Sequence, residues 1–329
     1  MKLFKRYKAI AYLPNLYSLL QYLLLEPYKK EDTLFFIHDE FPVPVAIRMK
    51  NAVFLLNISY TDRIISFLRI HYSVFINRYI PVFLGGDLIY TNKFLSCFTN
   101  IFYMEDGTLS YKCEATVTQL VYRKRKPMIS RLLYGDLHPW LGLSGNVQKI
   151  YLTGILPIPE IIADKVEIID LKQLWHQKDR KSQEEIKQLF LPADFDFSKM
   201  AGYDIFLLTQ PFTEFSSGNF SEQQKIEMYR KLLSGYDESK VIIKPHPAER
   251  TDYQYYFPTA MILDLCCPFE LLFLMGCDIK KAISVDSTAI FNLDDSVEKV
   301  ISGYDVTPAL AAEAKRRGIY TTNNLCNQT

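Results

Sequence analysis

The sequence predicts an α/β protein made of two domains, each built around an open parallel sheet. Three observations lead to this prediction. Short apolar runs alternate with segments of helical pattern, which is typical of parallel strands joined by crossover helices. The chain has 329 residues, more than one hydrophobic core usually serves. Its composition changes near the middle, where a polar, helix-prone segment over residues 176–190 leads into a candidate linker over 192–202.

The first domain is predicted to span residues 1–192. It begins with a strand over 10–13 and a helix over 16–25. Each further strand is a short apolar run bounded by polar or turn residues, as in strands buried on both faces. These strands are expected over residues 34–37, 52–56, 81–84, 101–104, 149–152 and 166–169.

The second domain is predicted to span residues 203–329. A helix is expected to start after Ser221, because Gln224 stands three residues on as in a capping box, and to end before Gly235. The tail over 294–318 has an amphipathic helical pattern, and we expect its helix to pack back on the first domain. The strands are expected over residues 205–208, 241–244, 260–263 and 282–285.

Composition and cysteine usage exclude several classes of protein. With 38 Lys+Arg and 37 Asp+Glu the formal net charge is +1, so no basic field attracts nucleic acid. The apolar stretch over 9–25 is interrupted by polar residues and lacks a cleavage site, so we predict neither a membrane span nor a signal peptide, and a cytoplasmic protein. No metal-ligand spacing occurs. Buried thiols in a reducing compartment are the expected state of the cysteines, Cys97, Cys113, Cys266, Cys267, Cys277 and Cys326.

An acidic turn follows the predicted strand over 101–104. It consists of Glu105, Asp106 and Gly107. Crowding of like charges raises the pKa of one carboxyl group, which suits a general base working near neutral pH. An exposed acidic turn without function is the ordinary alternative.

A histidine between two prolines follows the predicted strand over 241–244. Pro245 and Pro247 each fix their own φ, so His246 is held rigidly where a strand ends. An imidazole in this position can donate a proton or a hydrogen bond to a phosphate group.

Two further places carry polar groups at predicted helix starts. Ser287 and Thr288 follow the strand over 282–285, and hydroxyls beside free N–H groups at a helix start form an anion site. Glu270, which follows Phe269, begins an apolar helix. Its carboxylate either favours the helix N-terminus or accepts both hydroxyls of a ribose. A plain N-cap is the ordinary interpretation of Ser287.

Taken together, Glu105-Asp106-Gly107, His246-Pro247 and Ser287-Thr288 resemble the short motifs of bacterial sialyltransferases. Their order and spacing are most similar to glycosyltransferase family 52, the lipooligosaccharide sialyltransferases, with motifs shared by family 80 and the polysialyltransferases. The resemblance implies a GT-B fold, in which two Rossmann-like domains face a central cleft, the first on the acceptor side and the second binding the CMP-sugar.

The resemblance also implies inverting transfer of sialic acid from CMP-sialic acid to a terminal galactose-type sugar. The acceptor would belong to lipooligosaccharide, O-antigen or capsule, and no cofactor or essential metal is expected. By the same analogy the site residues would be Asp106 as the base with Glu105 beside it, His246, Ser287 and Thr288 at the CMP phosphate, Glu270 at the ribose, and Gly107, Pro247 and Phe269 among the donor-binding residues.

The chain departs from the family pattern at two places. Phe212 stands where members can carry a catalytic aspartate, so the base is either Asp106, which we favour, or the nearby Glu214. Ala248 stands where the family often has arginine after His-Pro, which makes Arg250 a candidate contact for the sugar carboxylate.

Two alternative functions stay open at this point. One is transfer of another CMP-activated acid such as Kdo, and the other is a non-catalytic sugar-nucleotide-binding subunit of a polysaccharide assembly complex. The basic run over 123–126, with Arg131, is either a solvated face or a contact with the anionic inner membrane leaflet, which would suit a lipid-linked saccharide acceptor. A homodimer also stays open.

Overall fold

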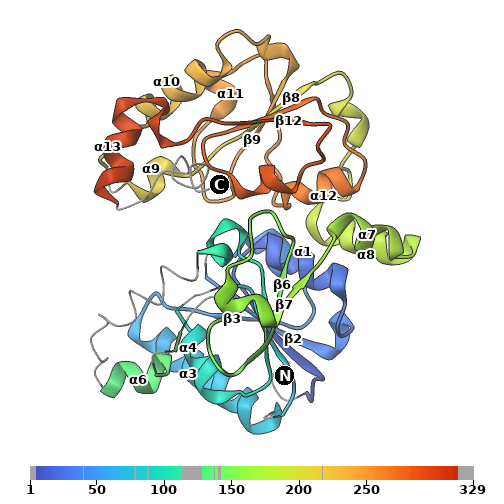
Figure 1. Cartoon of the computed structure of the whole chain (residues 1–329), viewed down its shortest axis with the longest axis vertical. Coiled ribbons are helices and arrows are strands. Elements are labelled where there is room, and N and C mark those ends of the chain that lie inside the picture. The colour runs from blue at the N-terminus through green and yellow to red at the C-terminus, as the bar shows by residue number, and fades with distance from the viewer. Residues whose placement is uncertain are drawn as a thin grey trace. The chain divides into compact units, whose positions relative to one another are not determined.

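The computed structural model describes the chain except for residues 1–4, 40, 78, 87–88, 113–127, 137, 140–141, 217 and 318–329. The chain divides into two compact units, Met1–Phe190 and Leu191–Thr329, and the division falls just before the predicted linker. In each unit the strands lie at the centre with helices around them (Figure 1). The predicted α/β class with two parallel sheets is confirmed.

The first unit has a seven-stranded sheet in the order β3-β2-β1-β4-β5-β6-β7. All of its neighbouring strands are parallel. Each predicted strand of this unit is present, with ends that shift by one or two residues. The bounds are β1 (Ala9–Leu13), β2 (Thr33–His38), β3 (Ala52–Leu55), β4 (Val82–Leu84), β5 (Ile101–Met104), β6 (Val147–Leu152) and β7 (Val166–Ile168).

The helices of the first unit include the predicted one over residues 16–25. Asn15 caps it by accepting a hydrogen bond from the backbone N–H of Ser18 (2.8 Å), which satisfies a donor that a helix start leaves free. The α-helices are α1 (Leu16–Leu25), α2 (Val43–Ala46), α3 (Tyr60–Asn77), α4 (Thr91–Cys97), α6 (Met128–Tyr134), α7 (Leu171–Gln177) and α8 (Arg180–Phe190). Short 3₁₀ helices are Lys30–Asp32, Gly107–Tyr111 and Glu160–Lys165.

The second unit has a five-stranded parallel sheet in the order β10-β9-β8-β11-β12. The strands are β8 (Ile205–Leu208), β9 (Val241–Lys244), β10 (Met261–Ile262), β11 (Lys281–Ser284) and β12 (Glu298–Ile301). The α-helices are α9 (Phe212–Phe215), α10 (Glu222–Leu233), α11 (Tyr253–Tyr256), α12 (Phe269–Leu274) and α13 (Pro308–Arg316). The 3₁₀ helices are Phe197–Met200, Glu238–Lys240, Thr288–Asn292 and Tyr304–Val306. The predicted capping box between Ser221 and Gln224 is formed at the start of α10.

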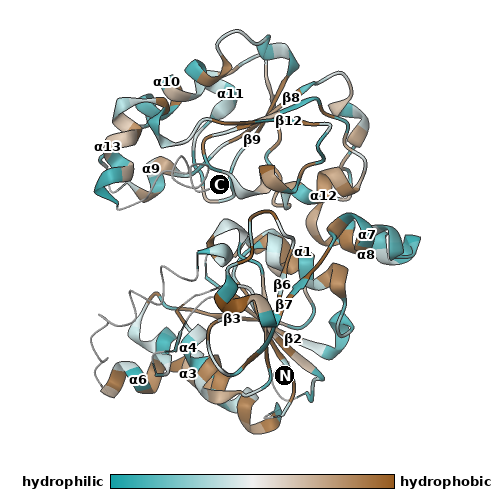
Figure 2. Ribbon diagram, in the orientation of Figure 1, coloured by the Kyte–Doolittle hydropathy of each residue, from teal (hydrophilic) through white to brown (hydrophobic). Residues whose placement is uncertain are grey.

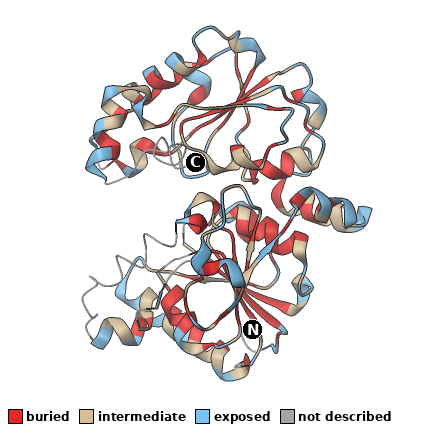
Figure 3. Ribbon diagram, viewed as in Figure 1, coloured by how far each residue is buried: buried red, intermediate tan, exposed pale blue. Residues whose placement is uncertain are grey.

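Residues of high hydropathy concentrate on the central strands of both sheets (Figure 2), and these strands are buried (Figure 3). In the first unit the buried core includes Ile10 of β1 and Leu84 of β4. In the second it includes Leu207 of β8, Ile243 of β9 and Ile283 of β11. Polar groups on the central strands are therefore confined to the strand ends.

One expectation about the C-terminal tail is wrong. The tail is not continuously helical, because Glu298–Ile301 forms strand β12 at the edge of the sheet. Helix α13 buries Leu310 in the core of its own unit, and packing of this helix on the first domain stays a prediction.

The described cysteines Cys97, Cys266, Cys267 and Cys277 carry free thiols, and the last two are buried. Cys113, Cys326 and the basic run over 123–126 lie outside the described residues. Among the described helices, none is both long and apolar enough to cross a membrane.

The placement of α13 predicts the effect of a core substitution. Leu310→Ala should lower the free energy of unfolding of the second unit by about 2–5 kcal/mol, because it leaves a cavity in that core. Lys315→Ala on the exposed face of α13 should stay within about 0.5 kcal/mol. Denaturant unfolding of both variants checks this, and equal small effects would contradict the placement.

Candidate active site

The loops after β1, β4 and β5 meet at one edge of the first sheet. These strands are neighbours and parallel, so their carboxyl ends lie on the same side. Asn15 follows β1, Gly85 and Gly86 follow β4, and Glu105 and Asp106 follow β5. Residues far apart in the sequence are thereby brought together around the predicted base.

Glu105 is fully buried, and its carboxylate is surrounded by donors. It accepts hydrogen bonds from the hydroxyls of Tyr17 (2.9 Å) and Tyr111 (2.8 Å). Thr153, which follows β6, adds its backbone N–H (2.6 Å) and its hydroxyl (2.9 and 3.0 Å). A carboxylate with these partners links helix α1 and the segments after β5 and β6. A catalytic part for Glu105 stays a prediction, while its burial and hydrogen bonds fit a structural role beside Asp106.

Asp106 is half-buried beside it. The side-chain amide of Asn15 donates to Oδ1 of Asp106 (2.9 Å), and the backbone N–H of Asp106 donates to the hydroxyl of Ser110 (2.7 Å). Oδ2 lies against the backbone of Gly86, where an added β-carbon would come within 2.5 Å of it. Gly107 has φ of +55°, a left-handed conformation that glycine adopts without strain as the chain turns into the 3₁₀ helix. The carboxylate is thus held from two neighbouring strands.

Sequence reasoning missed Asn15 and Gly86 as parts of this arrangement. Asn15 did carry a signal, since an asparagine between a strand and a helix is a typical N-cap. Gly86 is the second of two glycines that directly follow an apolar strand, which indicates close backbone approach.

In the second unit the central strands β9, β8 and β11 are parallel neighbours, and His246 follows β9. The backbone N–H of Ala248 donates to Nδ1 of the His246 ring (3.2 Å). Because Nδ1 accepts, the proton of the neutral ring is assigned to Nε2. The ring therefore offers Nε2–H as a donor.

The pKa of His246 is lowered from its ordinary 6.5 to about 4. Desolvation by the atoms packed around the ring is the larger cause, although the residue as a whole is exposed, and the charge of Lys244 adds to it. Glu214 acts in the opposite direction. The ring is neutral near pH 7, so its first contribution is a hydrogen bond and not a positive charge.

Ser287 and Thr288 lie where β11 ends, but the expected helix is only the 3₁₀ helix Thr288–Asn292. The expectation of a regular helix is wrong, and a single short 3₁₀ helix contributes few aligned peptide dipoles. An anion site at the two hydroxyls stays a prediction. The backbone N–H of Ser287 donates to the hydroxyl of Ser284 (2.9 Å), and the Ser287 side chain makes no capping bond.

Glu270 and Phe269 differ in what they can contact. Glu270 lies in the first turn of α12, where the side-chain amide of Asn292 donates to its Oε1 (3.2 Å). Phe269 is buried and packs edge-on against Phe206, with ring centroids 5.1 Å apart. This packing gives Phe269 a structural role, and its part in donor binding stays a prediction.

Lys244, the last residue of β9, was also missed. It is buried, and its ammonium group donates to the backbone carbonyl of Leu265 (3.2 Å). In sequence, a lysine at the end of an apolar strand looks like the first residue exposed to solvent. The pattern therefore gave no indication that its ammonium group is buried.

The alternative base, Glu214, is held in another role. Its carboxylate accepts hydrogen bonds from the hydroxyl of Thr213 (2.7 Å) and the backbone N–H of Arg250 (2.9 Å). Burial acts to raise the pKa of Glu214, but these bonds and the charge of Lys225 outweigh it and lower the pKa below its usual value. A carboxylate of lowered pKa is a weaker base, which disfavours Glu214.

Phe212 does not lie in a polar site. It is 4% exposed and packs edge-on against Phe220 and Tyr304, with centroids 6.1 and 6.0 Å away. The position at which the family can carry an aspartate is thus part of the core in this chain.

No group of three or more His, Cys, Asp or Glu side chains within the described part of the chain is arranged to hold a metal ion.

Residues 81–310 match the family model of glycosyltransferase family 52. The chain belongs to glycosyltransferase family 52. A Haemophilus influenzae relative described only as an uncharacterized protein is 36% identical over 179 residues, which cover 53% of this chain and 56% of that protein. The match therefore spans little more than half of the relative's length.

Three solved structures show that this family 52 chain has the GT-B fold. One is an α/β-galactoside α-2,3-sialyltransferase from Photobacterium phosphoreum, 12% identical with a TM-score of 0.56, covering 96% of this chain and 97% of that one. The second is the GT-B domain of a Photobacterium damselae sialyltransferase, 12% identical with a TM-score of 0.53, covering 94% and 97%. The third, a 2,6-sialyltransferase from Photobacterium sp. JT-ISH-224, is 13% identical with a TM-score of 0.55, covering 96% and 77%.

The state of His246 can be measured directly. Its ring resonances should titrate near pH 4 and stay constant between pH 6 and 8 in an NMR titration, with His246→Gln providing the assignment. The pKa of His246 is lower in the folded chain than in the unfolded chain, so between about pH 4 and 6.5 the unfolded chain binds more protons. The contribution of His246 to stability should therefore decline as the pH falls from about 6.5 towards 4, and His246→Gln should remove that part. Titration near 6.5 would contradict the description.

Proposed function

We propose that this glycosyltransferase moves sialic acid from CMP-sialic acid to a terminal galactose-type sugar of a bacterial surface glycan. The observation that carries the proposal is the carboxylate of Asp106, held by Asn15 at the carboxyl edge of the first sheet in a chain of family 52. The JT-ISH-224 enzyme, whose structure contains CMP as donor product and lactose as acceptor substrate, supports the choice of ligands.

In the proposed reaction Asp106 accepts the proton of an acceptor hydroxyl. The hydroxyl oxygen forms a bond to C2 of sialic acid while the bond from C2 to the phosphate oxygen breaks. The electron pair of that bond stays on the phosphate, which leaves as CMP. One displacement from the opposite face inverts the configuration at C2. A positioned base typically contributes about 10²–10⁴-fold to the rate.

The departing phosphate would be met by donors of the second unit. The neutral ring of His246 donates from Nε2, and Ser287 and Thr288 offer hydroxyls. Placed donors stabilise the negative charge that develops on the leaving group, and this stabilisation often accounts for most of an enzyme's rate enhancement. In this proposal the hydrogen bonds from these protein donors stabilise the charge of the phosphate without a metal ion. Transfer should therefore persist in the presence of EDTA.

Further contacts would select the donor. Glu270, which lies beside Asn292, would accept the hydroxyl groups of the ribose. Arg250 is exposed, and its guanidinium would contact the sugar carboxylate. A bidentate contact of this kind favours an acidic sugar over a neutral one. Gly107 would shape the backbone after Asp106, and Pro247 the backbone after His246.

A transfer assay tests this function. Purified protein with CMP-sialic acid and lactose should form a sialylated product, and Asp106→Asn should lower kcat/KM by about 10²–10⁴-fold. His246→Ala should lower kcat, because it removes a donor to the leaving group. Asp278→Asn, at an exposed aspartate, is the matched control and should leave the rate unchanged.

The other outcomes separate the alternatives. Transfer from CMP-Kdo without transfer from CMP-sialic acid would contradict the assignment of the sugar. Binding of CMP without transfer to a panel of galactose-ended, lipid-linked and polysaccharide acceptors would favour the non-catalytic subunit. Full activity of Asp106→Asn would show that another residue is the base.

A further inference from the structure

The loop from His246 to Arg250 has little apolar packing of its own. His246, Pro247, Ala248 and Arg250 are all exposed, so burial does not determine the loop's conformation. Its conformation depends instead on hydrogen bonds to its backbone N–H groups.

Each backbone N–H in this loop already has an acceptor. The N–H of His246 donates to Oε2 of Glu249 (2.8 Å), and the N–H of Glu249 donates back to the carbonyl of His246 (2.9 Å). The N–H of Ala248 donates to the His246 ring, and that of Arg250 to Oε1 of Glu214 (2.9 Å). Pro247 has no N–H. A phosphate at this loop is therefore met by side chains, above all the His246 ring, and not by a backbone cradle.

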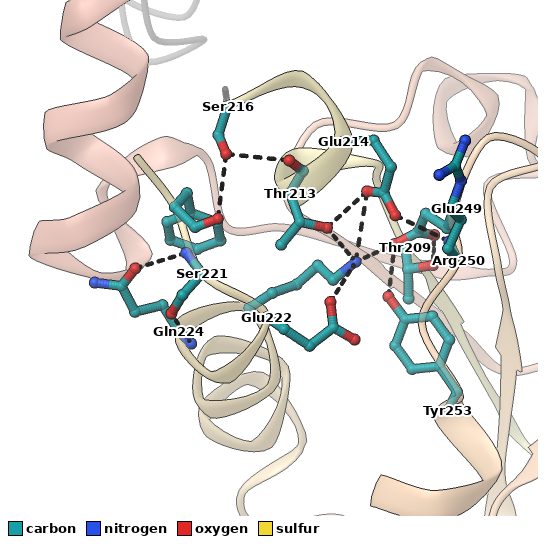
Figure 4. Close-up of polar contacts among 12 residues, drawn as sticks. Thr209, Thr213, Glu214, Ser216, Ser221, Glu222, Gln224, Glu249, Arg250 and Tyr253 are labelled. Atoms are coloured by element: carbon teal, nitrogen blue, oxygen red, sulfur yellow. Dashed lines mark hydrogen bonds and ion pairs between the residues drawn. The ribbon is translucent and has the colours of Figure 1, made fainter. Parts of the chain in front are cut away.

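Glu249 is the main anchor. Its side chain is 1% exposed, and three further donors hold it besides the His246 N–H. They are the hydroxyl of Thr209 after β8, the hydroxyl of Tyr253 in α11 (2.6 Å) and the ammonium group of Lys225 in α10 (3.3 Å). Figure 4 shows Thr209, Tyr253 and Glu249 in this arrangement. The carboxylate thus connects the backbone of His246 to α10, to α11 and to the end of β8.

Lys225 balances the charge of both loop anchors. Its side chain is 0% exposed, and its Nζ lies 3.3 Å from Glu249 and 3.7 Å from Oε2 of Glu214. It also donates to the hydroxyl of Thr213 (3.0 Å) and lies 3.7 Å from Glu222. Removing one partner of a buried ion pair leaves an uncompensated charge, which destabilises the fold.

Well-packed apolar residues often stabilise a core as much as a buried ion pair does. The specific feature of this pair is its connection to the loop, because two of the three carboxylates near Lys225, those of Glu249 and Glu214, accept hydrogen bonds from backbone N–H groups of the His246–Arg250 loop. We propose that Glu249 and Lys225 are positioning residues, which hold the loop so that the His246 ring presents Nε2 to the leaving phosphate. This inference rests on the proposed function of His246.

A matched pair of substitutions tests it. Glu249→Gln places an amide NH₂ where one of the donors needs an acceptor, and it should lower kcat about 10- to 100-fold, as expected when a reacting group is misplaced by about 1 Å. Glu222→Gln is the control, because Glu222 lies equally near Lys225 as Glu214 does but contacts no residue of the loop among the contacts described. It should change kcat by less than about twofold.

A double-mutant cycle between Glu249 and His246 distinguishes a positioning role of Glu249 from a general effect on stability. In the His246→Ala background, Glu249→Gln should have less than about a threefold effect, because its action passes through the ring. An undiminished effect would overturn the inference and indicate a structural role. If Glu249→Gln does not fold, Thr209→Val, which removes one donor to the same carboxylate, takes its place in the cycle.

A readout without any donor sugar keeps this test independent of the proposed function. Backbone hydrogen exchange across residues 244–251 should become faster in Glu249→Gln and in Lys225→Met, but not in Glu222→Gln. Unchanged exchange in the first two variants would overturn the positioning role even if transfer is found. Faster exchange in a protein that neither transfers nor binds CMP would leave the anchored loop in place but overturn its catalytic purpose.

Discussion

Both sheets consist of parallel strands throughout, and this constraint determines where polar chemistry can lie in the molecule. Interior strand positions are buried on both faces, as β1 and β8 show, so a polar side chain there would lose its hydration. Parallel strands also end at a common edge. Asn15 and Asp106 are therefore brought within 2.9 Å although 91 residues separate them in the sequence. In the second unit, too, polar residues follow the ends of neighbouring parallel strands: His246 follows β9, Thr209 follows β8 and Ser287 follows β11.

In each unit a buried carboxylate lies beside the residue proposed to act on the substrate. Glu105 adjoins Asp106, and Glu249 holds the backbone of His246. Burying a carboxylate is costly unless hydrogen bonds or an opposite charge compensate it. Glu105 is compensated by the donors of Tyr17, Tyr111 and Thr153, whereas Glu249 also has the cation of Lys225. The two carboxylates connect the site to the core, so the geometry of the reacting groups follows from the packing of the fold.

The sequence predicted the strands well because short apolar runs between polar residues have few other interpretations. It missed β12, whose Glu298 and Lys299 lie at a sheet edge and whose pattern resembles a helix face. Asp106 and His246 were recognisable at strand ends, but their partners were not, since pairing across the sheet leaves no mark on local spacing. Lys225 looks like an ordinary helix-surface lysine yet is buried, and the packing of Phe269 against Phe206 could not be read from local spacing. Such roles depend on which face of an element the tertiary structure covers.

The most direct test of the account is thermal stabilisation of the purified protein by a panel of CMP, CDP, UDP, GDP and ADP. A ligand at 100 times its dissociation constant should add about 2.7 kcal/mol to the free energy of unfolding. The account predicts stabilisation by CMP above the other nucleotides, with the effect reduced in Glu270→Gln and Ser287→Ala. A preference for UDP or GDP, or no response to CMP, would contradict a CMP-sugar donor.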